Sequence, residues 1–215
     1  MNGDRLTRAE FERRYSAMPD AKAELLEGIV YLSSPVHHRK HGTPHARVIG
    51  WLSYYLAFTP HLDYADNATV RLNETDEPQP DAFLRLESWV GGSSMRGEDD
   101  YLEGPPELVV EIAASSVSYD MHVKREVYRR GGVREYLIWR VDDEAFDWFV
   151  LREGRFERLE IEDGRLKSPT FPGLELDVNA LFQGDMAHLL AVIQEAVAKP
   201  EHAEFVKMLE ARAKG

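Results

Sequence analysis

The sequence PELVVEIA, residues 106–113, is the most informative stretch of the chain. Its continuous apolar run is typical of a strand buried on both faces of a sheet. A helical pattern over Ser118–Arg130 follows, stopped by two glycines, and Val133–Val141 then has a second strand pattern. This strand–helix–strand order predicts two parallel strands joined by a crossover helix. The expected fold class is therefore α/β or α+β, with one mixed central sheet flanked by helices.

The flanking sequence supplies the remaining elements. Thr7 and Glu10 form a capping box, which predicts a helix from Thr7 to Met18. Residues 88–106 have no regular pattern and are expected to form a loop, which acts as a lid, binds a ligand or is partly disordered. The remaining predicted elements are a strand at Leu25–Ser33, a helix opening at His41–His45, strands at 68–72 and 81–86, a hairpin at 146–151 and 155–160, a sheet-closing segment at 173–182, and helices at 185–198 and 201–213.

Composition narrows the class of protein. The chain has 215 residues and no cysteine, which excludes disulfide scaffolds, thiolate catalysis and cysteine-ligated metals. It has no apolar stretch of membrane-spanning length and no signal-peptide pattern, so we expect a cytoplasmic protein. We expect residues 1–182 to form the main domain and residues 183–215 a helical extension.

Charge is unevenly distributed along the chain. The net charge is −12, yet residues 28–62 contain no acid and carry Arg39, Lys40 and Arg47 with five of the eight histidines. Residues 73–111 contain eleven acids against two arginines. One segment could therefore face an anion and another gather carboxylates, but charge alone favours solvated surface as the explanation of both patterns.

Two carboxylates stand at strand positions. Glu111 interrupts the apolar run, where an ionised carboxylate is costly unless it is paired or binds a metal. Asp81 follows Pro80 at the start of another predicted strand, and a turn aspartate is the alternative interpretation. Two such carboxylates on neighbouring strands suit Mg²⁺, which prefers oxygen ligands. A third acid, Glu27, lies at the start of the first predicted strand.

The helix after Glu111 offers a cation. Asp120, Lys124 and Tyr128 are spaced by four residues and share one helix face. If that face packs against the sheet, Lys124 can point at the carboxylates and stabilise developing negative charge. A surface pair between Asp120 and Lys124 is the alternative.

Together these motifs resemble the Uma-type restriction endonuclease family of the PD-(D/E)XK nuclease superfamily. The resemblance rests on their order and spacing and covers roughly residues 5–182. The matching segments are Glu24–Gly28, Pro80–Asp81, Pro106–Ile112, Asp120–Tyr128 and Gly132–Leu137.

The resemblance implies a metal-dependent endonuclease that hydrolyses phosphodiester bonds, with DNA as the expected substrate and a homodimer as the expected assembly. Asp81 and Glu111 match the two acids that hold Mg²⁺ or Mn²⁺, and Glu27 matches a further acid of the site. The lysine expected two residues after the second acid is Ala113 here, so Lys124 is the implied substitute. Asp120 and Tyr128 support the site. The residues expected to contact nucleic acid are Arg39, Lys40, His41, His45, Arg47, Gln79 and Arg125.

Two other functions remain open at this point. Ala113 and the acidic surface fit a catalytically inactive nuclease fold that serves as a binding or regulatory module. The same carboxylates also fit a metal-dependent hydrolase of another phosphate ester, since a fold by itself does not set the substrate.

Overall fold

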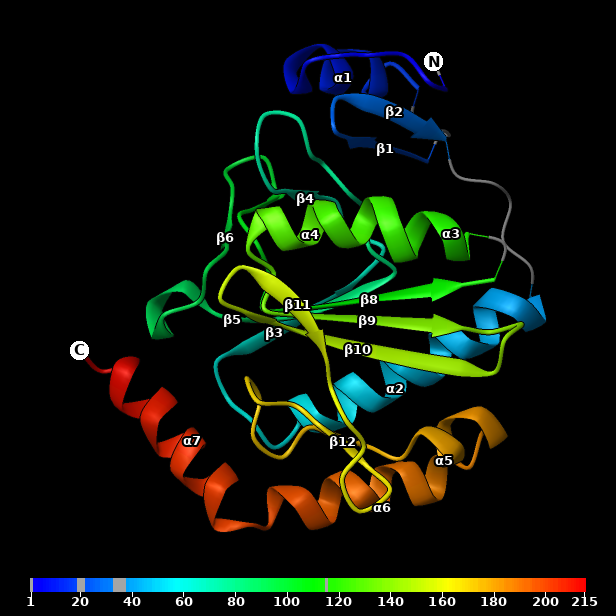
Figure 1. Ribbon diagram of the computed structural model, residues 1–215. Coiled ribbons are helices and arrows are strands. Elements are labelled where there is room, and N and C mark those ends of the chain that lie inside the picture. The colour runs from blue at the N-terminus through cyan, green and yellow to red at the C-terminus, as the bar shows by residue number, and fades with distance from the viewer. Residues whose placement is uncertain (1, 19–21, 33–37, 115) are drawn as a thin grey trace.

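A six-stranded sheet forms the centre of the protein, as the computed structural model shows (Figure 1). The structure describes residues 2–18, 22–32, 38–114 and 116–215. The strand order is β11-β10-β9-β8-β5-β3, and neighbours are antiparallel except for the parallel pair β8–β9. The strands are β3 (Leu62–Asp66), β5 (Ala82–Leu86), β8 (Leu108–Ala113), β9 (Glu135–Arg140), β10 (Ala145–Arg152) and β11 (Arg155–Arg158).

The predicted crossover between β8 and β9 is confirmed. Its helix runs without a break through α3 (Val117–Tyr119), the π-helical turn η3 (Asp120–Lys124) and α4 (Arg125–Gly131). Gly132 ends it with φ 87°, a left-handed conformation that suits glycine. The helix therefore lies across one face of the sheet, over the two parallel strands β8 and β9 that it connects (Figure 1).

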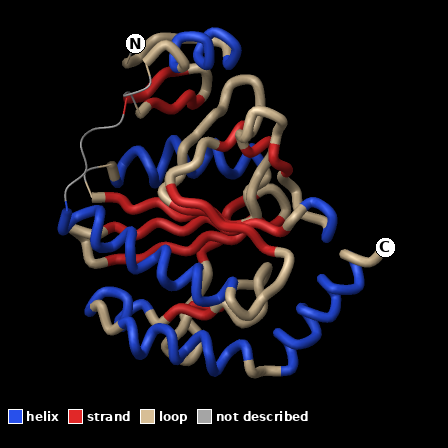
Figure 2. The backbone as a smooth tube through the Cα atoms, turned by 180° about the vertical axis from the view of Figure 1, so that it is seen from behind, coloured by secondary structure: helices blue, strands red, loops and turns tan. Residues whose placement is uncertain are grey.

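The opposite face of the sheet is covered by α2 (Thr43–Leu56) and by the helices of the C-terminal part of the chain. Trp51 and Leu52 of α2 pack in the main apolar core, and so do Leu189, Phe205 and Leu209 of the C-terminal helices. Figure 2 shows these C-terminal helices beneath α2 and the sheet. The elements are η1 (His38–Gly42), α2 (Thr43–Leu56), β12 (Leu166–Lys167), β13 (Glu175–Leu176), α5 (Val178–Gln183), α6 (Met186–Val197) and α7 (Pro200–Arg212).

Besides the pair β12–β13, two small sheets complete the described part of the structure. The first contains β4 (Val70–Arg71), β7 (Leu102–Glu103) and β6 (Met95–Arg96). Only seven of residues 88–106 lie in regular elements, namely the 3₁₀ turn η2 (Ser88–Val90) and the short strands β6 and β7, so most of this stretch is a loop as expected. The second is the hairpin of β1 (Ala23–Leu26) and β2 (Ile29–Leu32), which packs against α1 (Arg8–Tyr15).

The hairpin corrects one prediction. The expected single strand at residues 25–33 is broken at Glu27 and Gly28, which have φ values of 53° and 72° and turn the chain back on itself. Ser33, the expected end of that strand, lies outside the described residues. The edge strand β3 was not predicted. The segment at 173–182, expected to close the sheet, forms α5 and the strand β13, which pairs with β12 outside the six-stranded sheet. No helix in the described part of the chain has the length and apolarity to span a bilayer.

Candidate active site

Asp81 and Glu111 lie opposite each other at one end of the sheet. Ala82 of β5 pairs with Val110 of β8, and continuing this antiparallel register by one residue places Asp81 opposite Glu111. Asp81 is 6% exposed and Glu111 3%. Asp81 Oδ2 accepts a 2.7 Å hydrogen bond from the backbone N–H of Ile112, which fixes the side chain toward β8. The two predicted metal-binding carboxylates are thus brought together.

The crossover helix supplies a cation and a hydroxyl to Glu111. Lys124 Nζ and the Tyr128 hydroxyl both donate to Glu111 Oε1, at 2.9 Å and 2.7 Å. All three residues are buried. The face that carries Lys124 and Tyr128 therefore points at the sheet, and Lys124 does not form the surface pair considered for it.

The π-helical turn helps to aim this face. Asp120 and Lys124 are the two ends of η3, and both are buried. A π turn widens the helix and is frequent at functional sites. Ser116 donates from its hydroxyl to Asp120 Oδ2, and Tyr136 donates to the Asp120 backbone carbonyl at 3.1 Å. These contacts hold the helix start over β9.

Glu24 completes the cluster, a position that sequence analysis missed. Glu24 Oε1 lies 2.9 Å from Lys124 Nζ and accepts a 2.7 Å hydrogen bond from the Gln79 backbone N–H. Glu27, the predicted third acid, is in the hairpin turn, is 46% exposed and pairs with Arg130 at 2.9 Å. The structure therefore brings Glu24 to the cluster and leaves Glu27 outside it. A Glu-Gly turn signal at 27–28 would have placed Glu24 inside a strand.

Burial and charge shift the titration of these groups. Burial raises the pKa of Glu111 well above its usual value; Lys124 opposes this rise, and the charges of Asp81, Asp120 and Glu24 add to it. Burial also raises the pKa of Asp120 to about 6, against the charge of Lys124.

The pKa values of Lys124 and Asp81 shift in the direction that favours the charged form of each side chain. Burial lowers the pKa of Lys124, but the carboxylates around it outweigh burial and raise that pKa well above its usual value. Burial raises the pKa of Asp81, but the hydrogen bond and charge of His41 outweigh it, so the pKa of Asp81 is lowered. The site therefore contains a firmly protonated lysine and an ionised aspartate.

Two histidines of the acid-free segment reach Asp81. His41 Nε2 lies 3.1 Å from Asp81 Oδ1. His45 Nε2 lies 2.7 Å from the Asp81 backbone carbonyl oxygen and 3.1 Å from Asp66 Oδ1. Both imidazole rings are largely buried. Their contacts with Asp81 orient this residue, and this role is separate from the expected contact with phosphate.

The other predicted nucleic-acid contacts are dispersed. Lys40 pairs with Asp142 at 2.8 Å, and Arg47 donates to the carbonyls of Leu181 and Phe182 at the end of α5. Arg125 lies over the ring of Phe149, away from Glu111. Arg39 is exposed and lines a pocket described below.

Gln79 lies beside the cluster. Its Nε2 donates to the Asn67 carbonyl at 2.7 Å, while its Oε1 is buried without a hydrogen-bond partner. A buried acceptor of this kind, on the residue whose backbone N–H binds Glu24, suits a hard cation or its water. Among the described residues no three His, Asp or Glu side chains surround one point as a metal cage would. Two carboxylates still fit Mg²⁺ or Mn²⁺, because such ions usually take one or two carboxylates plus water and phosphate oxygens.

Comparison with known proteins places this geometry in a family. No curated protein shows significant similarity to the chain. Among solved structures, it resembles a protein of Anabaena variabilis ATCC 29413 described as a "putative nuclease belonging to DUF820", with 15% identity and a TM-score of 0.59 over 75% of this chain and 89% of that one. That likeness shows the nuclease fold. The model of the Uma2 family, described as "Putative restriction endonuclease", matches residues 8–179, so the chain belongs to the Uma2 family.

Proposed function

We propose that the protein is a nuclease that uses Mg²⁺ or Mn²⁺ to hydrolyse phosphodiester bonds of nucleic acid, with DNA as the expected substrate. The observation that carries the proposal is the buried contact of Lys124 with Glu111, directly opposite Asp81. The family and the fold support nuclease chemistry. The expected homodimer and cytoplasmic location stay predictions.

Asp81 and Glu111 would hold the ion. When bound, it would polarise the scissile phosphate and lower the pKa of an attacking water. His41 and the Ile112 N–H fix the orientation of Asp81, and Tyr128 fixes that of Glu111. Such fixed partners keep the carboxylates in place without reorganisation during the reaction.

Lys124 would stabilise the negative charge that develops on the phosphate. Its raised pKa keeps the ammonium protonated across the physiological range. Glu24 holds the same ammonium through a carboxylate that the Gln79 N–H orients. Glu24 is therefore a positioning residue, and Lys124 reaches from the helix the place that Ala113 cannot fill.

Metal binding is the first test. Calorimetry with Mn²⁺ should show stoichiometric binding to the wild type and loss of binding in Asp81→Asn and Glu111→Gln. Glu175→Gln is the matched control, because Glu175 is a buried, cation-paired carboxylate on β13, outside the cluster. Cleavage of single- and double-stranded DNA and RNA follows, with Asp81→Asn as background. Absence of cleavage on every substrate at saturating metal would overturn the proposal.

A non-catalytic binding module is the second candidate. Its support is that Lys124 already pairs with both Glu111 and Glu24, so these two carboxylates have a cationic partner without a metal. This candidate predicts that the wild type binds no Mn²⁺ and that nucleic-acid affinity is unchanged in Asp81→Asn. The same two experiments therefore separate the candidates.

A further inference from the structure

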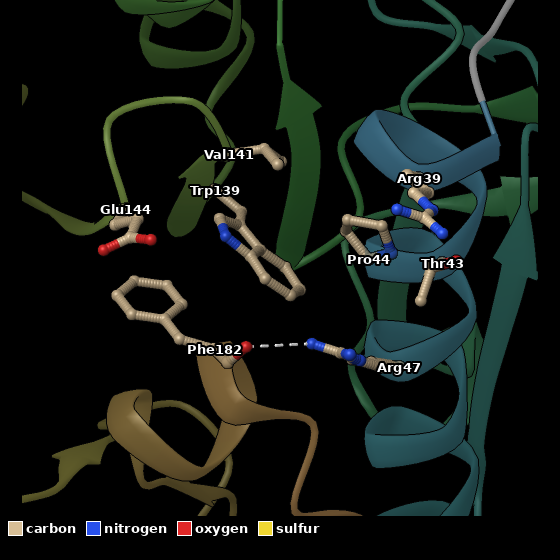
Figure 3. A pocket seen from close by; sticks show the side chains of 8 residues that line it. All are labelled: Arg39, Thr43, Pro44, Arg47, Trp139, Val141, Glu144 and Phe182. Carbon is tan, nitrogen blue, oxygen red and sulfur yellow. Dashed lines mark hydrogen bonds between the residues drawn. The ribbon is translucent and has the colours of Figure 1, made fainter.

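A pocket of about 220 Å³ lies on the other side of the sheet end that holds the carboxylates. Trp139 and Phe182 form one wall, and Arg39, Thr43 and Pro44 at the start of α2 form the other (Figure 3). The rings of Trp139 and Phe182 lie 5.7 Å apart and are inclined by 33°. Arg47, Val141 and Glu144 complete the lining, so the pocket is a slot with an aromatic wall whose rim carries two arginines and one carboxylate.

Arg39 is the cation available in this slot. It is exposed, and no ion pair joins it to the part of the chain that the structure describes. Its neighbour Lys40 is bound to Asp142, and Arg47 is occupied with the carbonyls of α5. In a protein of net charge −12, an exposed arginine beside an aromatic wall suits an anionic, planar ligand.

The slot and the carboxylate cluster are joined by one turn of η1. Arg39 and His41 belong to this five-residue turn, and His41 Nε2 lies 3.1 Å from Asp81 Oδ1. Glu111 pairs with Ile138 in the parallel register, and the next residue, Trp139, faces the slot from the opposite side of the sheet. A nucleic-acid strand whose phosphates pass His41 at this end of the sheet would reach both the slot and the carboxylate cluster.

The size and chemistry of the slot point to one nucleotide. Pockets for drug-sized ligands are about 300–1,000 Å³, so this smaller pocket suits a single planar group. Aromatic walls bind bases by stacking, and a base inside a duplex cannot present its face in this way. Arginine at the mouth matches the adjoining phosphate.

We propose that this slot binds one unpaired nucleotide of the substrate strand, with its base against Phe182 and Trp139 and its phosphate on Arg39. The inference rests on the proposed function in taking nucleic acid as the ligand. It adds that the strand is single or locally unpaired beside the cleavage site.

Calorimetry with the four deoxynucleoside 5′-monophosphates, and with ribose 5-phosphate as the base-free probe, tests the proposal. The nucleotides should bind at least about fivefold more tightly than ribose 5-phosphate. Phe182→Leu should remove this preference, and Arg39→Gln should weaken nucleotide binding about tenfold. Arg152→Gln is the matched control, because Arg152 is likewise an exposed arginine but lies at the end of β10, outside the slot.

Three results would overturn the slot: no nucleotide binding, equal binding of ribose 5-phosphate, or the same loss in Arg152→Gln as in Arg39→Gln. A melting curve of each variant checks that it is folded. Asp81→Asn separates the two proposals, because it should lose Mn²⁺ and keep nucleotide binding. If the wild type binds nucleotides but no Mn²⁺, the nucleotide slot is supported and the proposed nuclease activity is contradicted. If it binds Mn²⁺ but no nucleotide, only the slot is contradicted.

Discussion

Lys124 holds the buried carboxylates of the sheet end together. Its ammonium lies 2.9 Å from both Glu24 and Glu111, and all three side chains are less than a tenth exposed. Removing one partner of a buried ion pair costs about 3–5 kcal/mol, because the other charge stays buried without compensation. The stability of the domain and the chemistry of the site therefore depend on the same side chain.

Replacing Lys124 should make stability depend on metal. Lys124→Met should lower the free energy of unfolding by about 3–5 kcal/mol, for the reason just given. Added Mn²⁺ should raise the melting temperature of this variant more than that of the wild type, because a divalent ion binds the freed carboxylates of the folded state. Thermal melts with and without 5 mM Mn²⁺, roughly a saturating dose for a micromolar site, measure both effects.

Lys199→Met serves as the control for that change. Lys199 also pairs with a buried glutamate, Glu175, but it is 46% exposed and lies outside the cluster. It should show a small loss of stability and no metal response. An equal response to Mn²⁺ in both variants would contradict the assignment of the carboxylates as ligands.

Asp120 should make stability fall as pH rises. Burial raises its folded pKa to about 6, above the value in the unfolded chain, so the folded state binds more protons between these values. Its contribution is fully present below about pH 4 and is lost as pH rises through about 6. The free energy of unfolding of Asp120→Asn should therefore rise relative to the wild type by about 2–3 kcal/mol from pH 4 to pH 7.

Urea unfolding of both proteins at four pH values between 4 and 7 gives this difference directly. Subtracting the two curves removes the contribution of every group that titrates equally in both proteins. A difference that does not change with pH would contradict the raised pKa.

Sequence reasoning found three of the four clustered residues for a simple reason. Asp81, Glu111 and Lys124 each stand out locally, as an acid after proline, an acid in an apolar run and a lysine on a helix face. Glu24 and Glu27 are close in the sequence, and only the position of the turn decides which of the two lies in the cluster. Choosing between the two required the hairpin register, in which Glu24 pairs with Tyr31.

The turn of the β1–β2 hairpin gives a prediction at the scale of the element. Glu27 has φ 53°, a left-handed conformation that costs a residue with a side chain about 1–2 kcal/mol and that asparagine tolerates better. Glu27→Asn should therefore raise the free energy of unfolding by about 0.5–1 kcal/mol, less what the exposed pair with Arg130 contributes. Urea unfolding measures this change.

The same variant separates a structural role of Glu27 from a catalytic one. Calorimetry should show unchanged Mn²⁺ affinity in Glu27→Asn, since the side chain pairs with Arg130 and not with Lys124. A loss of metal binding comparable with that of Asp81→Asn would restore Glu27 to the site.

Elements with a strong local pattern were predictable, and elements made by distant partners were not. The sequence of β8, the crossover helix and β9 carries its own apolar period and glycine stop, and all three are present. The edge strand β3 is half-polar and is defined by pairing with β5. The short strands β6 and β7 have only two residues each, too few to show a period.

At the scale of the whole molecule, the C-terminal helices belong to the core. Leu209 of α7 is fully buried in the same apolar cluster as Trp51 and Trp148, and His202 lies 3.0 Å from the Thr59 hydroxyl beside α2. The boundary expected at residue 182 therefore does not separate two apolar cores. Removing the contacts of α7 should therefore destabilise the sheet as well.

Leu209→Ala should destabilise the protein by about 2–5 kcal/mol, the usual cost of a large-to-small change in a core. The unfolding curve should remain a single transition by both far-UV circular dichroism and tryptophan fluorescence. Met208→Ala is the control, because Met208 is the neighbouring residue of α7 and is 37% exposed. Loss of α7 signal ahead of the sheet would show an independent helical unit instead.

The distribution of the cluster over four chain segments governs when it can form during folding. The four residues come from the hairpin (Glu24), the position just before β5 (Asp81), β8 (Glu111) and the crossover helix (Lys124), so most of their contacts have high sequence separation. Until these segments dock, water solvates every charge; at docking, several charges lose that hydration together. We therefore expect assembly of the site to be a late, slow step, with an apolar sheet and helix forming first and the ionic centre closing last.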